Sequence, residues 1–151
     1  MIITFAGHSI VLSADKVKEL VKNEIRKNSN NSETIQCYLG GYGDFDNICA
    51  RACKELKQEY QRIEVIYISP YLTLSEQEKI KEFQRSGLYD SSIYPIENTP
   101  PKFSILKRNE WMILKSDLVI VYINHSYGGA YKTYQTALRR KKKIINICDF
   151  L

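Results

Sequence analysis

The sequence lacks any long hydrophobic run. Its longest uninterrupted apolar stretch, Leu118 to Ile123, is far short of the roughly 20 residues that a membrane-spanning helix needs. The N-terminus carries no basic segment ahead of its first apolar residues and no cleavage site, both of which a secretion signal would have. The composition therefore excludes a membrane or a secreted protein, and we expect a cytoplasmic one.

Cysteine is scarce, and its placement does not match a metal site. The four cysteines are Cys37, Cys49, Cys53 and Cys148, and neither a CxxC pair nor a Cys/His pair has zinc spacing. Cys49 and Cys53 lie four residues apart in an expected helix, hence on one face of it. We predict that all four are reduced core residues and that the chain binds no metal and no cofactor.

The chain has 151 residues, of which 44% are apolar and 26% charged. These values are typical of one globular domain, which we expect to span residues 1–151. The net charge of +5 suits an anionic ligand or a nucleic acid but requires neither. Much of the excess lies in the run Arg139 to Lys143, which we interpret as the solvated end of a helix, favoured by the helix dipole.

Five apolar, β-branched runs are nearly continuous rather than alternating, as in strands covered on both faces. They are Ile2–Ala6, Ile35–Leu39, Ile63–Ser69, Leu118–Asn124 and Ile144–Cys148. Segments with apolar residues at helical spacing separate them. This alternation predicts an α/β fold, a doubly wound, mainly parallel five-stranded sheet with helices on both faces.

Two features lie between the third and fourth of these strands. Ser75 to Arg85 is predicted to be a helix, with Ser75 and Glu78 forming a capping box at its start. The proline-rich segment that follows, Ser86 to Lys102, is long for a connector. Loops of this length are often lids or binding loops, which is our expectation here.

Glycine-rich turns follow two of the predicted strands, and each leads into a helix. Gly40, Gly41 and Gly43 follow the second strand, and Gly128 and Gly129 follow the fourth. Glycine lets the backbone approach a ligand, and a helix start offers unpaired N–H groups with partial positive charge. Because ligands of doubly wound sheets bind beyond the carboxyl ends of the strands, the two turns predict a phosphate site.

Three side chains near these turns each have alternative interpretations. Asp46 would repel a phosphate and is therefore a poor phosphate ligand. It is instead an acceptor for ribose hydroxyls, a general base, or part of a helix start that is capped at Asp44 or Asp46. His8 is a ligand donor or a loop histidine with its hydrogen bonds satisfied. Arg108 is a forked phosphate ligand or a surface helix charge.

Tyrosine is abundant, with eleven in the chain. Tyr42, Tyr71, Tyr94 and Tyr127 are predicted to lie at or near the strand ends. Their rings suit stacking on a purine and their hydroxyls suit a sugar or a phosphate, although any single one of them is as compatible with a core or interface position.

Taken together, these residues resemble the SLOG superfamily and, within it, the YpsA-related branch. The matching stretches run in order along nearly the whole chain: Ala6–His8, Gly40–Asp46, Ala50–Ala52, Tyr94–Pro95, Pro100–Phe103, Lys107–Met112, Ser116–Ile120 and Gly128–Thr133. The superfamily includes Lonely Guy phosphoribohydrolases, DNA-processing protein A and the nucleotide-sensing domains of Thoeris defence proteins. The resemblance implies a Rossmann-like fold, a nucleotide-derived ligand at the two glycine turns, and a homodimer or larger assembly.

The resemblance argues against catalysis of the Lonely Guy type. Those enzymes combine an arginine, four residues before a methionine, with a glutamate that closes a GGxGTxxE motif. Arg108 and Met112 fit the first pattern, but counting from Gly128 the glutamate position is Gln135. A glutamine cannot ionise, so it cannot serve as a base or stabilise an oxocarbenium-like charge. We therefore favour binding over turnover.

The leading hypothesis is a protein that binds a nucleotide-derived small molecule of the ADP-ribose or cyclic ADP-ribose type. A chain of this length leaves no room for the effector fused to the Thoeris domains, which favours an anti-phage signal carrier, a subunit of a separate effector, or a sponge for an immune messenger. An N-glycosidic hydrolase using Asp46 and Arg108 is the alternative, and single-stranded nucleic-acid binding ranks last. The predicted ligand contacts are Gly7, His8, Ser9, Gly40, Gly41, Tyr42, Gly43, Asp46, Arg108, Ser126, Tyr127, Gly128, Gly129, Ala130 and Thr133.

Overall fold

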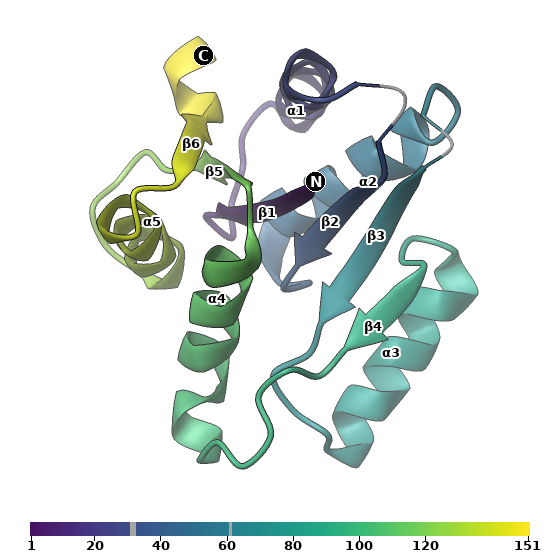
Figure 1. The fold of residues 1–151 in the computed structure, drawn as a ribbon, viewed down its shortest axis with the longest axis vertical. Helices are drawn as coiled ribbons and strands as arrows, with labels where there is room; N and C mark the ends of the chain where they lie inside the picture. The colour runs from purple at the N-terminus through teal and green to yellow at the C-terminus, as the bar shows by residue number, and fades with distance from the viewer. Residues whose placement is uncertain (31–32, 61) are drawn as a thin grey trace.

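The computed structural model describes residues 1–30, 33–60 and 62–151, and its centre is a parallel β-sheet (Figure 1). The sheet has six strands in the order β4-β3-β2-β1-β5-β6, and every neighbouring pair is parallel. The strands are β1 (Ile2–Gly7), β2 (Ile35–Leu39), β3 (Ile63–Ile68), β4 (Ser91–Ile93), β5 (Leu118–Tyr122) and β6 (Lys143–Asn146).

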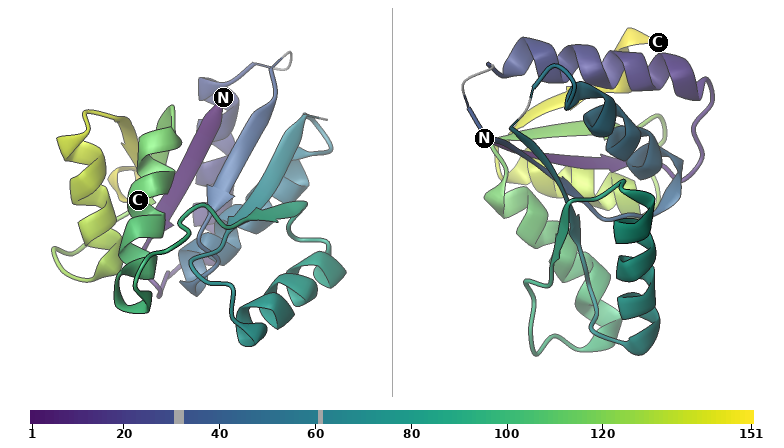
Figure 2. Two further views of the ribbon diagram at one scale, coloured as in Figure 1. Left: turned by 60° about the horizontal axis from the view of Figure 1, so that its bottom comes forward. Right: turned by 90° about the vertical axis from the view of Figure 1, so that its right-hand side faces the viewer.

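Helices cover both faces of this sheet, so the doubly wound architecture is confirmed. The α-helices are α1 (Ala14–Asn28), α2 (Gly43–Leu56), α3 (Leu74–Ser86), α4 (Ser104–Lys115) and α5 (Gly129–Arg139), with 3-10 turns η1 (Pro101–Phe103) and η2 (Ile147–Phe150). The helices α1 and α2 pack together on one face, and α4 and α5 on the other (Figure 2). No helix in the described ranges is both long and apolar enough to cross a bilayer.

The predicted strand count was one too low. β4 lies inside Ser86–Lys102, the segment predicted to be a loop, and pairs with β3 through Ser91, Ser92 and Ile93. This segment carries no strand signal, because an edge strand of three residues with two serines needs neither a continuous apolar run nor β-branched side chains. The other five strands were predicted, β2 with both ends exact and the others with ends that differ by at most two residues.

Three of the four cysteines are fully buried in the core, as predicted. Cys37, Cys49 and Cys53 have no exposed surface, and the Sγ atoms of Cys37 and Cys53 lie 3.4 Å apart. Cys148 is only partly buried and lies in η2 rather than in the last strand. All four are free thiols.

The helix α3 begins two residues earlier than the capping-box prediction had it. The N-cap is Thr73, whose side chain accepts a hydrogen bond from Glu76 N at 3.3 Å, and Ser75 lies inside the helix. Both residues are suitable caps, but only Thr73 has the extended backbone that a cap requires. The earlier start places Glu76 in the first turn, where it is 8% exposed.

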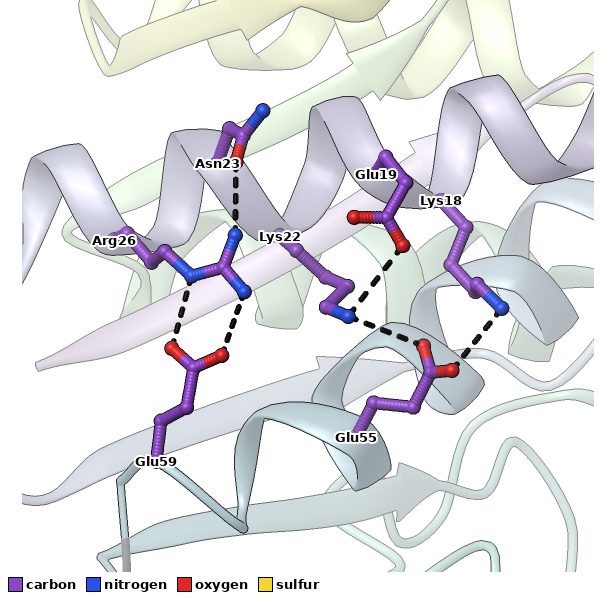
Figure 3. A network of polar contacts seen from close by, with 7 residues as sticks. All are labelled: Lys18, Glu19, Lys22, Asn23, Arg26, Glu55 and Glu59. Carbon is purple, nitrogen blue, oxygen red and sulfur yellow. Dashed lines mark hydrogen bonds and ion pairs between the residues drawn. The ribbon is translucent and has the colours of Figure 1, made fainter.

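Ion pairs join α1 to α2 and to the turn that follows α2 (Figure 3). Lys18 and Lys22 both contact Glu55, at 3.1 and 3.6 Å, and Arg26 donates two hydrogen bonds to Glu59, at 2.9 and 2.7 Å. Side chains this exposed contribute little stability in solvent, so the apolar faces of the two helices dominate their packing.

The basic run ends α5, as predicted, and also binds the neighbouring helix. Arg139 is the last residue of α5, and Arg140 and Lys141 are exposed. Lys142 Nζ donates to Leu114 O at 3.2 Å and to Ser116 O at 2.9 Å, at the carboxyl end of α4. Part of the positive charge therefore satisfies helix-end carbonyls instead of facing solvent alone.

Candidate ligand-binding cavity at the strand ends

A cavity of about 830 Å³ lies beyond the carboxyl ends of β1, β2, β3 and β5. In the sheet, β2, β3 and β4 lie on one side of β1, and β5 and β6 lie on the other side. The cavity therefore lies at the point where the strand order reverses. Its volume falls within the range of small-molecule sites. The lining residues come from the ends of strands, from the turns after them, and from α2, α3, α4 and α5.

Most of the predicted contact residues line this cavity. The lining includes Gly7, His8, Ser9, Gly40, Tyr42, Asp46, Arg108, Tyr127, Gly128, Gly129, Ala130 and Thr133. Gly41, Gly43 and Ser126 do not line it. Residues from three separate strand-to-helix connections, together with Arg108 of α4, are thus brought to one place.

Two of the glycines after β2 are required by packing. Both have positive φ, +68° at Gly41 and +86° at Gly43. A Cβ on Gly41 would lie 2.7 Å from the Tyr67 ring, and one on Gly43 would lie 2.7 Å from the Ser9 backbone. In addition, the N–H of Asp44 already donates to Ser9 O at 2.9 Å. The start of α2 therefore has fewer free N–H groups for binding an anion than the sequence had predicted.

The glycine turn before α5 is different, because open space adjoins it. Gly128 has a φ of +92°, which favours glycine, but a Cβ on Gly129 would meet nothing within 4 Å and its φ lies in the ordinary range. No side chain caps α5, and the first N–H groups of a helix have no acceptor within it. Both glycines and Ala130 line the cavity, so this helix start has the features of an anion site.

Asp46 is buried inside the cavity and does not cap the helix. Its carboxylate is 8% exposed and accepts a hydrogen bond from Tyr42 N at 3.1 Å. Because α2 begins at Gly43, neither Asp44 nor Asp46 is an N-cap, and Asp44 instead accepts from Val11 N at 3.0 Å. Burial raises the pKa of Asp46 to about 6, against the opposing effects of the Tyr42 N–H and of the Arg108 and Lys79 charges.

Arg108 is a buried residue, so its interpretation as a surface charge was wrong. It is 5% exposed, and its Nη1 donates to Gly40 O at 3.2 Å and to Ile68 O at 2.8 Å, the backbone just beyond β2 and at the end of β3. Its Nε donates to Asn109 at 2.8 Å. Within the described residues Nη2 has no hydrogen-bond partner, so one nitrogen, and not a two-nitrogen fork, is free for a ligand.

Several cavity residues were missed by sequence reasoning, and the most polar of these is Glu76. Its Oε1 accepts hydrogen bonds from Tyr67 OH and, at 3.1 Å, from Ser69 Oγ. Lys79 lies one turn further along α3 and also lines the cavity. The sequence does contain a signal for it, an acidic residue in the first turn of a helix that follows a strand.

The two histidines and one tyrosine form an aromatic stack at the β5 end of the cavity. The His8 and His125 ring centroids lie 3.4 Å apart, and those of His125 and Tyr127 lie 3.8 Å apart. His8 Nε2 accepts a hydrogen bond from Asn124 N at 3.1 Å. Burial, together with His125, lowers the pKa of His8, so its ring is neutral at pH 7. His8 is thus both a satisfied loop histidine and a lining residue.

The predicted tyrosines divide between two hollows. Tyr42, Tyr71 and Tyr127 line the cavity, and Tyr42 and Tyr127 are 75% and 70% exposed. Tyr94 lines a separate hollow of about 530 Å³ beside α4. Because no residue of Ser86–Lys102 lines the main cavity, that segment is not a loop of this site.

These observations define a Rossmann-like α/β protein with a ligand-sized cavity at the switch point of its sheet. No protein-family model matches the sequence, and no curated protein matches it. Solved structures do match. DNA processing protein A from Helicobacter pylori, reported for its single-stranded DNA binding mode, has a TM-score of 0.62 at 19% identity over 95% of this chain. The molybdenum cofactor carrier protein MCP from Chlamydomonas reinhardtii has a TM-score of 0.56 at 16% identity over 95% of this chain.

These similarities show the fold. The Rossmann-like architecture that the family resemblance implied is confirmed, and a DNA-processing protein A is among the similar structures. The chain spans 63% of that protein's length and 73% of the carrier protein's.

Proposed function

We propose that this chain binds a nucleotide-derived small molecule, of the ADP-ribose or cyclic ADP-ribose type, in the cavity at the strand ends. The observation that carries the proposal is the start of α5. Gly128 and Gly129 adjoin open space there, the helix has no side-chain cap, and the turn lines a cavity of about 830 Å³. A phosphate accepts hydrogen bonds from such N–H groups and is favoured by the helix dipole.

Aromatic rings beside this anion site support a ligand with a base. Tyr127 is exposed on the outer side of the histidine stack, and Tyr42 is exposed at the turn after β2. Both line the cavity, so either ring can stack on a purine held by its phosphate at α5. We further propose that the chain belongs to the SLOG superfamily, in its YpsA-related branch, and that it carries or sequesters an anti-phage signal.

Binding without turnover is favoured by the residues around α5. Gln135 occupies the position of the Lonely Guy glutamate and does not line the cavity. One observation favours a second candidate, an N-glycosidic hydrolase. Asp46 lies in the cavity with its pKa raised to about 6, close to the value at which a carboxyl group works as a general acid or base.

A third candidate, single-stranded DNA binding, is suggested by the similar DNA processing protein A. Arg108 and Lys79 in the cavity and the exposed Arg139, Arg140 and Lys141 are cations that phosphates would meet. Binding of this kind weakens steeply as salt rises. An oligonucleotide titration at low and high salt therefore belongs in the same test.

The test is one incubation of the purified chain with AMP, ADP-ribose, NAD and cyclic ADP-ribose isomers, followed by chromatography of the supernatant and of the extract from denatured protein. We expect an intact nucleotide in the extract and no free base. Free base beyond one equivalent that disappears in Asp46→Asn would establish the hydrolase instead. Binding of oligonucleotide alone would establish the third candidate and overturn the first.

A further inference from the structure

The cavity has two ends of different chemistry. Glu76 and Lys79 of α3 follow β3, while Gly128 and Gly129 follow β5, and β2 and β1 lie between. Neighbouring strands are roughly 4.8 Å apart, so β3 and β5, which are three positions apart in the sheet, are separated by about 14 Å. Side chains that point into the cavity make the distance between its two ends shorter than this. A ligand that fills the cavity meets both ends.

Charge is balanced at the α3 end. Among the described residues, the Asp, Glu, Lys and Arg side chains that line the cavity are Asp46, Glu76, Lys79 and Arg108. Arg108 interacts with both carboxylates, and Lys79 with Asp46. Two carboxylates and two cations leave this end without net charge, whereas no carboxylate lines the cavity beside the uncapped start of α5. An anionic group is therefore drawn to α5, and the α3 end suits a neutral group.

One carboxylate oxygen at the α3 end is held in place but unused. Tyr67 OH donates to Oε1 of Glu76, and Ser69 Oγ, which donates to Tyr71 O at 2.7 Å, lies 3.1 Å from the same carboxylate oxygen. Within the described residues Oε2 accepts no hydrogen bond, and the side chain lines the cavity while being 8% exposed. This second carboxylate oxygen is therefore available to a ligand in the cavity, and the hydroxyl groups of a sugar would supply the donors.

We propose, on the basis of the proposed function, that the α3 end is a subsite for a ribose diol, in which Glu76 Oε2 accepts the hydroxyl hydrogens and determines specificity. The ligand then has its phosphate at α5 and a sugar at α3. This distinguishes nucleotides with a second, terminal ribose from those that end in phosphate, because a phosphate oxyanion has no hydroxyl hydrogen to donate to Glu76 Oε2 and meets no net positive charge at the α3 end.

The test compares ADP-ribose with ADP as probes in calorimetric titrations of the wild-type chain and Glu76→Gln. The wild type should bind ADP-ribose at least about tenfold more tightly than ADP, since a hydrogen bond to a charged acceptor is worth about that factor. Glu76→Gln should reduce the ratio to within about threefold and leave the affinity for ADP within about threefold. Its amide oxygen can still accept from Tyr67 and Ser69, so the fold is kept, as a melting curve would verify.

Glu78→Gln is the matched control, because it removes the same charge from an exposed position of α3 that does not line the cavity. It should keep the full preference for ADP-ribose. If the wild type binds both probes equally, or if Glu76→Gln keeps the preference, the ribose subsite is wrong while the proposed nucleotide site stands. If the wild type binds neither probe nor any other nucleotide, the proposed function fails, and the subsite with it.

Discussion

Arg108 holds together the ends of two strands as well as lining the cavity. Its Nη1 bridges the carbonyl oxygens of Gly40 and Ile68, from connections that the sequence places 28 residues apart. Close packing accompanies this role, since a Cβ on Gly40 would lie 3.0 Å from the guanidinium. A single side chain thus couples the stability of the strand ends to the shape of the cavity.

We expect Arg108→Ala to lower the free energy of unfolding by about 2–4 kcal/mol, because each buried carbonyl left without a donor costs about 1–3 kcal/mol. Urea denaturation measures the change. Arg108→Lys keeps the charge but cannot bridge the two carbonyls in the same way, so it should lose a smaller part of this stability. A change below about 0.5 kcal/mol, typical of surface substitutions, would contradict the bridging role.

Asp46 makes the stability depend on pH in a defined direction. The pKa of its carboxyl group rises from 3.8 to about 6 on folding, so between about pH 4 and pH 6 the folded chain holds a proton that the unfolded chain releases. The contribution of Asp46 to stability therefore falls as pH rises through this window. Asp46→Asn removes the buried charge and should raise the unfolding free energy at pH 7.5 by about 1–3 kcal/mol.

Denaturant unfolding at pH 4.5 and pH 7.5 checks this expectation. The gain from Asp46→Asn should be present at the higher pH and shrink at the lower one. Asp15→Asn, which removes an exposed carboxylate from α1, provides the control and should give no such gain. Loss of stability in Asp46→Asn at pH 7.5 would show that its charge stabilises the fold through Arg108 and Lys79.

At the scale of the elements, the helix starts differ in how fully their N–H groups are used. Thr73 caps α3 with its side chain, and the loop after β1 occupies an N–H of α2. The start of α5 has neither arrangement, although its turn lines the cavity. The ion pairs between α1 and α2 in Figure 3 lie outside this cavity, so changes there test packing and not ligand binding.

Gly129→Asp should separate stability from binding. The new side chain meets open space, and an acidic residue in the first turn of a helix stabilises it by about 0.3–1 kcal/mol. The same negative charge would repel a phosphate at this turn, so the affinity for ADP-ribose should fall by about 100-fold or more. Melting curves and calorimetry together measure both effects.

Gly129→Ala is the matched control, since it fills the same space without charge and should keep more of the affinity. If Gly129→Asp keeps both the fold and the affinity for ADP-ribose, this turn has a structural role and does not bind the phosphate.

At the scale of the whole molecule, exposed apolar side chains gather around the cavity. Ile10, Leu12 and Ile105 are 75%, 76% and 51% exposed, and all three line it. Apolar patches of this kind mark interaction sites, and the family resemblance implied a homodimer or larger assembly. Self-association stays a prediction.

Light scattering tests whether the chain self-associates. We expect a mass of about 35 kDa for a dimer, twice the chain mass of 17.6 kDa. If the rim of the cavity takes part, Leu12→Glu should shift the population toward monomer, because burying a charge in an apolar interface is costly. Leu138→Glu, at an exposed apolar position outside the cavity, should not. A monomer at every concentration would contradict the prediction.

Five of the six strands and the helices between them follow from local patterns in the sequence, because a buried parallel strand needs a continuous apolar run and a helix needs apolar spacing near 3.6 residues. The position of the cavity also follows, since parallel strands end at the same edge of a sheet. Gly128 and Gly129 were recognised for the same reason. The strand β4 was not predicted, because it is held by pairing with β3 and its own residues lack the apolar run that marks a buried strand.

The chemistry inside the cavity was decided by tertiary structure. The burial of Arg108 and the raised pKa of Asp46 depend on residues far apart in the chain, and Glu76 meets Tyr67 and Ser69 because α3 packs back against the end of β3. Local sequence sets which side chains are present and where each element turns. Desolvation and charge pairing arise only when the elements pack, so the sequence determined the position of the cavity and the tertiary structure determined which of its polar groups are already paired.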